Sequence, residues 1–142
     1  MSYANPSDDV LKQLLTDATT IAMVGASANP EKASYGIMQK LQAVGYRVIP
    51  VNPREAEILG ERSYPSLTDI PDHVDIVDVF RRAEDTPAIA DDAVKIGAKA
   101  FWLQTGITND EAAARATAGG LTVVMDACIG ASHSLLRVPP KR

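Results

Sequence analysis

The feature that most constrains the fold is a pattern that occurs three times along the chain. A helix-forming stretch ends in glycine and an apolar stretch follows, at Gly45 before YRVIPV, at Gly97 before AKAFWL, and at Gly119–Gly120 before LTVVM. Glycine after a helix is typical of a C-terminal cap, and a short apolar run is typical of a buried strand. Strands that alternate with amphipathic helices predict right-handed βαβ units and a parallel sheet covered on both faces.

Further segments extend this scheme at the N-terminal end and in the middle of the chain. Ser7 as an N-cap, two acidic residues after it and apolar residues at helical spacing predict a first helix at 7–18. Ile21–Val24 and Val74–Phe80 predict two further strands. We therefore predict an α/β fold, a single Rossmann-like, doubly wound parallel sheet of about five strands with helices on both faces.

Two helix starts and two irregular regions complete the prediction. Thr86 reads as an N-cap with proline at the first helical position, and Thr108–Glu111 reads as a capping box. The stretch 53–73 is rich in turn-forming residues, with a short edge strand predicted near Arg62–Tyr64 and one helical turn after Ser66. We expect the tail, 129–142, to be irregular.

Composition bounds the class of protein. The chain has 142 residues, 46% hydrophobic and 23% charged, and we expect one domain over 1–142. The formal net charge of −4 provides no overall positive field, so we expect neither a nucleic-acid nor a membrane partner. The one cysteine, Cys128, excludes an internal disulfide and any multi-cysteine metal site. No stretch is apolar enough for export or a membrane span, which predicts a cytoplasmic protein.

The stretch Ile21–Gly36, IAMVGASANPEKASYG, is the first indication of a ligand. An apolar strand ends in Gly25 and a loop of small residues, and a helix is predicted to begin at Ser34. Such a junction leaves backbone N–H groups unpaired near the positive end of the helix dipole, which attracts phosphate. A nucleotide-like ligand is therefore the first hypothesis. Lys32 lies in this loop, where it either closes over a phosphate or stays solvated.

The predicted topology brings four chain segments to one cleft. In a doubly wound sheet, ligands bind outside the carboxyl ends of the strands where the winding direction reverses. The strands at 21–25 and 75–80 are predicted to be central neighbours, so their ends and the next strand ends meet there. Arginines in such a cleft offer bidentate contacts to phosphate and a planar face for stacking. The residues at the four ends are Gly25, Ala26 and Ser27; Asn52, Pro53 and Arg54; Phe80, Arg81 and Arg82; and Gln104, Thr105, Gly106 and Ile107.

The absence of two known motifs limits which class of nucleotide the cleft is expected to bind. The dinucleotide fingerprint G-x-G-x-x-G does not follow Gly25, and the sequence has no Walker A pattern. NAD-binding proteins also place an acidic residue at the end of the second strand, where it binds the ribose 2′-hydroxyl. Asn52-Pro53-Arg54 stands at that point here, with Glu55 next to it. An arginine there suits a ribose with an additional phosphate, as in NADP or coenzyme A (CoA).

Six segments in a fixed order resemble a known family. They are VGAS with Ser34-Tyr35-Gly36, then GYRVIPVNP, LGERSYPSLTDIP, DIVDVFRR, WLQTGI and VVMDACI, and they run from about Thr20 to Cys128. In these segments the chain resembles the small CoA-binding domain proteins of the YccU-like family. The fold of that family resembles the N-terminal domain of the succinyl-CoA synthetase α subunit and of NDP-forming acyl-CoA synthetases.

The resemblance implies a Rossmann-like domain that holds CoA. It implies that Gly25–Ser27 and Ser34-Tyr35-Gly36 contact the ligand, and that Val51-Asn52-Pro53 and nearby Arg54 lie by the adenosine and its phosphates. It also implies that residues 80–82 and 104–107 line the opposite wall. In the synthetases, a second domain carries the phosphorylated histidine, and this sequence stops before such a domain. The resemblance therefore implies CoA binding without synthetase activity.

We predict a module that binds CoA or an acyl-CoA at the carboxyl ends of its strands and has no catalytic residues. It would act as a carrier, a sensor or the partner of a larger enzyme, and the sequence leaves open which acyl form and which protein partner it takes. One alternative is an NADP-dependent oxidoreductase or an NADP-binding regulatory domain, although no evident proton donor lies near the cleft. Another alternative is an interaction domain without a ligand.

Several candidate residues also have a plain structural interpretation. Arg81 and Arg82 can pair with the nearby acids Glu84 and Asp85, and we expect one of the two arginines, Arg81 in preference, to reach the cleft. Tyr35, in the first helical turn, either contacts the ligand or packs on the neighbouring loop.

Other polar and reactive residues are interpreted as structural. Cys128, His133 and Asp126 are a conceivable nucleophilic set, because a cysteine needs a base to become a thiolate. Cys128 follows a buried strand, however, where a small hydrophobic residue is the ordinary role, so we predict no catalysis. Trp102 is predicted to belong to the core, and Asp78, inside a buried strand, requires a partner.

Overall fold

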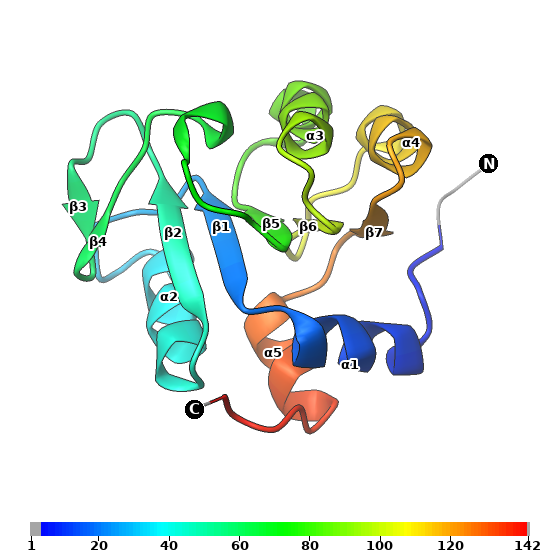
Figure 1. The fold of residues 1–142 in the computed structure, drawn as a ribbon, viewed down its shortest axis with the longest axis horizontal. Coiled ribbons are helices and arrows are strands. Elements are labelled where there is room, and N and C mark those ends of the chain that lie inside the picture. The colour runs from blue at the N-terminus through cyan, green and yellow to red at the C-terminus, as the bar shows by residue number, and fades with distance from the viewer. Residues whose placement is uncertain (1–3, 142) are drawn as a thin grey trace.

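The computed structural model describes residues 4–141, which form a central sheet with helices on both faces (Figure 1). In chain order the elements are α1 (Asp8–Asp17), β1 (Thr20–Val24), α2 (Ala33–Ala43), β2 (Arg47–Val51), β3 (Glu57–Ile58), β4 (Glu61–Arg62), the 3-10 turn η1 (Leu67–Asp69), β5 (Ile76–Val79), the 3-10 turn η2 (Ala83–Asp85), α3 (Thr86–Lys95), β6 (Ala100–Leu103), α4 (Asp110–Ala118), β7 (Thr122–Val124) and α5 (Ile129–Leu135). Within residues 4–141, no helix is long and apolar enough to cross a membrane.

The central sheet has five strands in the order β2-β1-β5-β6-β7, and every pairing in it is parallel. The chain leaves β1 toward β2 on one side and returns to β5 on the other, so the winding direction reverses between β1 and β5. This topology confirms the predicted Rossmann-like, doubly wound α/β fold. It also confirms that the strands near 21–25 and 75–80 are central neighbours.

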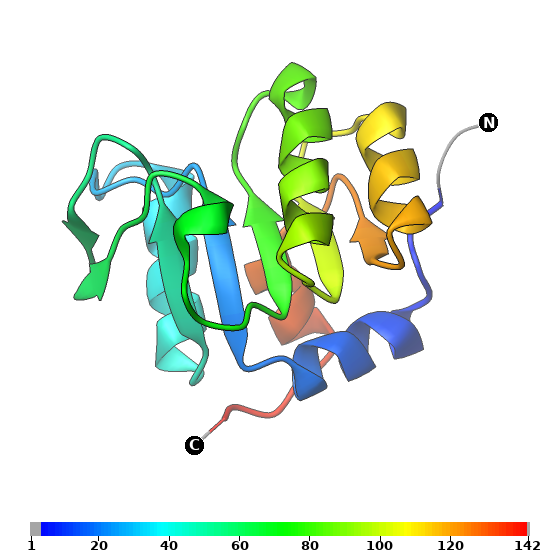
Figure 2. The same cartoon turned by 45° about the horizontal axis from the view of Figure 1, so that its top comes forward.

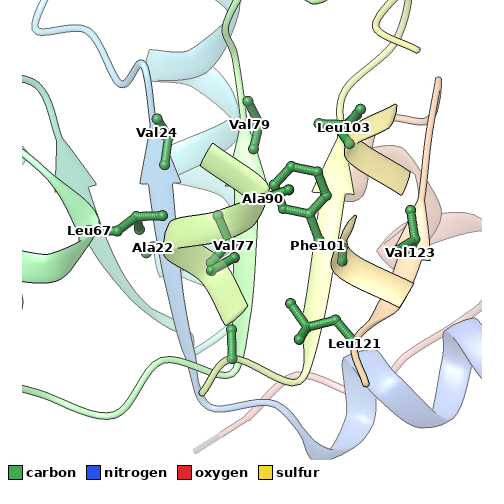
Figure 3. Close-up of a cluster of buried hydrophobic side chains, with 14 of the residues drawn as sticks. Ala22, Val24, Leu67, Val77, Val79, Ala90, Phe101, Leu103, Leu121 and Val123 are labelled. Carbon is green, nitrogen blue, oxygen red and sulfur yellow. The ribbon is translucent and has the colours of Figure 1, made fainter. Parts of the chain in front are cut away.

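Two hydrophobic cores lie on the two faces of the sheet. Helices α3 and α4 cover one face, and α1, α2 and α5 cover the other (Figures 1 and 2). Alternate strand residues point to alternate faces, so the core under α3 contains Ala22, Val77 and Phe101 (Figure 3). Trp102 points to the other core, as predicted, and its indole N–H donates to the carbonyl of Ala127 at 2.8 Å. Each large buried side chain stabilises the fold by about 1.5–3 kcal/mol.

The start of α1 and the ends of three helices follow the prediction. The Ser7 hydroxyl accepts from the Val10 N–H at 3.4 Å, as an N-cap does. Gly45, Gly97 and Gly120 lie just after α2, α3 and α4, and all three have positive φ. The pattern from which the fold was inferred therefore reflects left-handed backbone at helix ends.

Two helix starts differ from the prediction. Helix α3 begins at Thr86 itself, whose hydroxyl donates to the carbonyl of Ala83 at 2.6 Å, so Thr86 is not the N-cap. In α4 the N-cap is Asn109 rather than Thr108, because the extended backbone of Asn109 lets its side chain accept from the N–H of Ala112 at 2.9 Å. Thr108 and Asn109 are both polar residues that can cap a helix, and in this structure Asn109 does so.

The irregular stretch 53–73 contains more structure than predicted. Strands β3 and β4 pair as a small antiparallel hairpin, so the strand expected near Arg62–Tyr64 begins one residue earlier and has a partner. A parallel bridge between Val51 and Tyr64 then attaches this segment to the edge of the main sheet. The helical turn expected after Ser66 is η1.

The prediction of an irregular tail over 129–142 is wrong for its first half, which forms α5. Gly130 and the neighbouring serines favour helix weakly, so the local sequence does not indicate this helix. Packing stabilises it instead: Ile129 and His133 are buried, and the Lys40 ammonium donates to the Gly130 carbonyl at 2.7 Å. Tertiary contacts commonly decide whether such a short helix forms.

Candidate ligand-binding site

Three adjoining cavities lie at the carboxyl ends of the parallel strands. The loop cavity, of about 390 Å³, is lined by Gly25, Ala26, Ser27, Lys32, Ala33, Ser34, Asn52 and Phe80. The apolar cavity, of about 580 Å³, is lined by Ala33, Ile37, Phe80, Arg81, Arg82, Gln104, Thr105, Ile107 and Cys128. The proline cavity, of about 230 Å³, is lined by Val24, Val51, Pro53, Pro65, Ser66, Leu67, Arg81, Asp85, Ile89 and Asp92. Shared lining residues join them, since Ala33 and Phe80 border the first two and Arg81 borders the last two.

Gly25 allows the loop cavity to form. Its φ is +86°, and a Cβ built on it would lie 2.3 Å from the carbonyl oxygen of Phe80, so no larger residue fits without movement of the backbone. The Gly25 N–H donates to the carbonyl of Val51 at 3.0 Å. The ends of β1, β2 and β5 are thereby packed together at one point.

The loop cavity presents hydrogen-bond donors that no protein group uses. The backbone N–H groups of Ser27, Ala33 and Ser34 donate to no acceptor within residues 4–141. Ala33 and Ser34 begin α2, and the Lys32 side chain makes no ion pair with any described residue. The positive end of the helix dipole, orphan N–H groups and a free ammonium together favour an anion such as phosphate.

Asn52 shapes the loop cavity rather than presenting free polar atoms to it. Its side-chain NH2 donates to the Ala26 carbonyl at 2.8 Å, and its side-chain oxygen accepts from the Arg54 N–H at 2.8 Å. Both ends of the amide are therefore engaged, and they fix the loop after β1 against the loop after β2. Asn52 is thus a positioning residue in this structure.

The two arginines after β5 differ in their surroundings. Arg81 lies between the apolar and proline cavities, and its guanidinium bonds to the Asp85 carboxylate at 3.1 Å. This contact, helped by the charge of Arg82, holds the pKa of Asp85 below its usual value. Arg82 pairs with Glu84 at 3.1 Å and is 74% exposed, against 45% for Arg81. The plain interpretation as ion pairs is therefore confirmed, and both arginines line the apolar cavity, so the preference for Arg81 as a ligand contact stays a prediction.

Gln104 is a buried polar residue in the wall of the apolar cavity. It is only 4% exposed, and its side-chain oxygen accepts from the N–H of Ile129, at the start of α5, at 3.1 Å. Its side-chain NH2 donates to no acceptor in the described part of the chain. Next to it, the Gly106 N–H donates to Asp126 at 2.6 Å, which holds the loop after β6 against the loop after β7.

Not every predicted site residue lines these cavities. Tyr35, Gly36, Arg54 and Gly106 stand outside the three linings, and their contact with a ligand remains a prediction. The structure adds lining residues that the sequence did not assign to a site: Val24, Ala33, Ile37, Pro65, Ser66, Leu67, Asp85, Ile89, Asp92 and Cys128. Helical periodicity could not distinguish Ile37 from a core residue, because both functions need an apolar side chain on the same helix face.

The conceivable set of Cys128, His133 and Asp126 is not assembled. The Asp126 carboxylate is bonded to Gly106, whereas His133 is buried beside Tyr46, with ring centroids 5.7 Å apart and no partner for its Nε2 within residues 4–141. Burial, together with the charges of Lys40 and Lys141, lowers the pKa of His133, so its imidazole is neutral at pH 7. No hydrogen bond joins the His133 ring to the Cys128 thiol among the described residues, so His133 is not placed to act as its base.

Asp78 lies in the core without the partner that the sequence analysis required. It is completely buried between the β-sheet neighbours Met23 and Trp102, and neither carboxyl oxygen has a hydrogen-bond partner among the described residues. Burial raises the pKa of Asp78 well above its ordinary value, because the charged form loses its hydration. Burial therefore favours the protonated, uncharged form of Asp78 in the native state.

The fold and the site together define a class of protein. A doubly wound sheet with an anion-suited loop at its switch point is a Rossmann-like domain of the nucleotide-binding type. Residues 19–134 match the family described as CoA binding domain, and the chain therefore belongs to that family. The resemblance inferred from six sequence segments is confirmed.

Relatives include proteins of the same length and one much longer enzyme subunit. The chain is 39% identical over 133 residues to the uncharacterized protein YneT of Bacillus subtilis (strain 168), covering 94% of this chain and 98% of YneT. A hypothetical protein from Pyrococcus horikoshii OT3 of known structure is 38% identical, with a TM-score of 0.90 over 96% of this chain and 99% of that one. ADP-forming acetate–CoA ligase I subunit alpha of Pyrococcus furiosus is 34% identical over 93 residues, which are 61% of this chain and 20% of the subunit. The chain thus matches about a fifth of the ligase subunit.

Proposed function

We propose that this protein binds CoA or an acyl-CoA at the carboxyl edge of its sheet and acts as a carrier, a sensor or the partner of a larger enzyme. The observation that carries the proposal is the loop cavity of a CoA-binding domain family member, where the N–H groups of Ser27, Ala33 and Ser34 have no acceptor in residues 4–141. Lys32 adds a positive charge at the same place. We propose no catalytic step for these residues.

The three cavities match the three chemical parts of CoA. The pyrophosphate would lie in the loop cavity, where donors and the α2 dipole stabilise its charge. The adenosine would lie in the proline cavity, whose walls include Val51, Leu67 and Ile89 and whose carboxylates accept hydrogen bonds from an amine or hydroxyl. The pantetheine arm would then enter the apolar cavity. Arg81, between the proline and apolar cavities, or Arg54 would pair with the 3′-phosphate.

Calorimetry with CoA, dephospho-CoA, NADP and NAD tests this proposal. We expect CoA to bind more tightly than either dinucleotide. A failure of CoA to bind at 1 mM, which corresponds to a binding free energy weaker than about −4.1 kcal/mol, would overturn it. Preference for NADP would instead support the alternative of an NADP-dependent protein.

The role of the arginines is tested by a pair of ligands that differ in one phosphate. Arg54→Ala and Arg81→Ala should each be compared for CoA and dephospho-CoA. The arginine that binds the 3′-phosphate will weaken CoA binding by about tenfold or more and leave dephospho-CoA nearly unchanged. Equal losses for both ligands would refute that role. Native mass spectrometry of the purified protein would identify a ligand that stays bound during isolation.

A further inference from the structure

We infer that the apolar cavity holds the acyl group of a short-chain acyl-CoA, and that the Gln104 side-chain NH2 donates to the thioester carbonyl. The inference rests on the proposed binding of CoA at the loop cavity and goes further, because it names an acyl thioester rather than free CoA as the preferred ligand.

The position of the cavity puts it at the thiol end of the ligand. The apolar cavity shares Ala33 and Phe80 with the loop cavity, so an arm that leaves a phosphate in the loop cavity passes directly into it. At about 580 Å³ it is the largest of the three cavities. It therefore has room for a group beyond the end of the arm.

The walls of the cavity suit an alkyl group. Ile37 from α2, Phe80 after β5 and Ile107 after β6 present apolar atoms to it, and each is partly buried against a hydrophobic core. A free thiol gains little from such walls, whereas each methylene of an acyl chain that is removed from water stabilises the complex. The cavity thus favours the acylated ligand over free CoA.

Gln104 supplies the polar contact that the cavity needs for orientation. Its oxygen accepts from the Ile129 N–H at 3.1 Å, which fixes the amide, and its NH2 has no acceptor among residues 4–141. The Gln104 Nε2 atom remains accessible in the wall of the apolar cavity, so it is available to donate to a ligand there. A thiol sulfur is a weak acceptor, whereas the carbonyl oxygen of a thioester is a full one. Free CoA therefore leaves this donor without its best partner.

The first test compares acyl chains by calorimetry with CoA, acetyl-CoA, propionyl-CoA and butyryl-CoA. We expect Kd to fall from CoA to acetyl-CoA, and then by about fourfold for each methylene that the cavity buries. If CoA binds as tightly as butyryl-CoA, this inference is wrong while the proposed function stands. If none of the four ligands binds, the proposed function itself fails.

A conservative variant tests the carbonyl contact. Gln104→Glu keeps the oxygen that accepts from Ile129 and replaces the donor NH2 by a carboxylate oxygen. We expect butyryl-CoA to lose at least tenfold more affinity than desulfo-CoA, which lacks both thiol and acyl group. The matched control is Gln39→Glu, which adds the same charge on the exposed side of α2 and should leave the ratio of the two affinities unchanged. Equal losses for the two ligands in Gln104→Glu would overturn the assignment.

A third measurement needs no variant. Cys128 is the one cysteine of the chain and lines the apolar cavity, so its alkylation by iodoacetamide reports whether the cavity is filled. At saturating ligand, we expect butyryl-CoA to slow the modification at least tenfold more than desulfo-CoA does, as followed by intact-protein mass spectrometry. Equal protection by the two ligands would show that the acyl group lies elsewhere.

Discussion

The amino edge of the sheet, where its parallel strands begin, and the carboxyl edge, where they end, differ in how their polar groups are paired. At the amino edge, one oxygen of the buried Asp75 carboxylate accepts from the Thr19 N–H at 2.8 Å, the Thr20 N–H at 3.1 Å and the Thr19 hydroxyl at 3.1 Å. The other oxygen faces His73 at 3.1 Å and Lys99 at 3.9 Å. Although burial acts to raise the pKa of Asp75, these hydrogen bonds and the charge of His73 lower it overall. Both oxygens of Asp75 therefore have partners within the protein at the amino edge.

The carboxyl edge, called the open edge below, has donors without acceptors in the described part of the chain. There the N–H groups of Ser27, Ala33 and Ser34 and the NH2 of Gln104 find no acceptor within residues 4–141. At the amino edge, by contrast, the buried Asp75 carboxylate is paired with several donors. The donors without an acceptor in residues 4–141 thus gather at the opposite edge, at the switch point of the sheet, which is where the proposed ligand would lie.

The largest effect is expected where the open edge is blocked. Gly25→Ala places a methyl group 2.3 Å from the Phe80 carbonyl and strains a backbone at φ +86°. We expect CoA affinity to fall more than 100-fold and the free energy of unfolding to fall by about 3 kcal/mol. Calorimetry and urea denaturation measure the two quantities.

The matched control for this variant is Gly60→Ala. Gly60 has a similar φ of +83°, but a Cβ there would meet no atom within 4 Å. We expect a loss of about 1 kcal/mol from backbone strain and no change in affinity. If both variants lost affinity alike, strain rather than closure of the loop cavity would be the cause.

The next largest effect concerns the amino edge. Asp75→Ala leaves the N–H groups of Thr19 and Thr20 without their acceptor and should lower the free energy of unfolding by about 3 kcal/mol, with CoA affinity within twofold of the wild type. Asp72→Ala is the control, because it removes an exposed pair with Arg47 at 2.7 Å and should cost less than about 1 kcal/mol. A loss of CoA affinity in folded Asp75→Ala would contradict the division of roles between the edges.

The next effect concerns the contrast between Asp75, just before β5, and Asp78 within β5. The pKa of Asp78 is raised by burial, so as pH rises above its ordinary value of 3.8 the unfolded chain releases this proton and the native protein keeps it. Asp78 therefore makes the native state less stable, by up to about 1.4 kcal/mol per pH unit, until the raised pKa is passed. Asp78→Asn should remove this slope and be more stabilising at pH 8 than at pH 5.

Thermal denaturation across pH measures the slope for Asp78→Asn and for the exposed control Asp9→Asn, which leaves the core intact. His133 acts in the opposite sense, because its pKa is lowered and its contribution to stability is lost as pH falls below 6.5. A wild-type slope that persisted in Asp78→Asn between pH 5 and 8 would show that the carboxyl is not neutral in the native protein.

The smallest effect is expected for the charge at the open edge. Lys32→Met removes an exposed ammonium beside the loop cavity and should weaken CoA binding by about tenfold at low salt, with a smaller loss at high salt because the contact is screened. Stability should stay within about 0.5 kcal/mol. Lys12→Met on α1 is the control and should leave binding unchanged. If the loss of CoA affinity did not depend on salt, Lys32 would not act through its charge on the ligand.

Local signals in the chain sufficed for much of the architecture. Glycine after each helix and an apolar run after each glycine predict the parallel sheet, because a left-handed helix end and a buried strand each restrict the residues that they accept. The small residues after β1 predict the loop cavity in the same way, because only glycine fits at position 25 beside the Phe80 carbonyl. These features are short-range, and the amino-acid sequence by itself determined them.

The tertiary structure decided what depends on partners distant in sequence. Helix α5 forms because Ile129 and His133 are buried against other helices, although its own residues favour helix weakly. The sequence places Gln104 at the cleft, but only the fold shows that Ile129, 25 residues away, holds its oxygen and leaves its NH2 without an acceptor among residues 4–141. Burial and hydrogen-bond satisfaction are properties of the assembled core, so no local pattern encodes them. The sequence determined where a ligand could bind, and packing decided which donors were left for it.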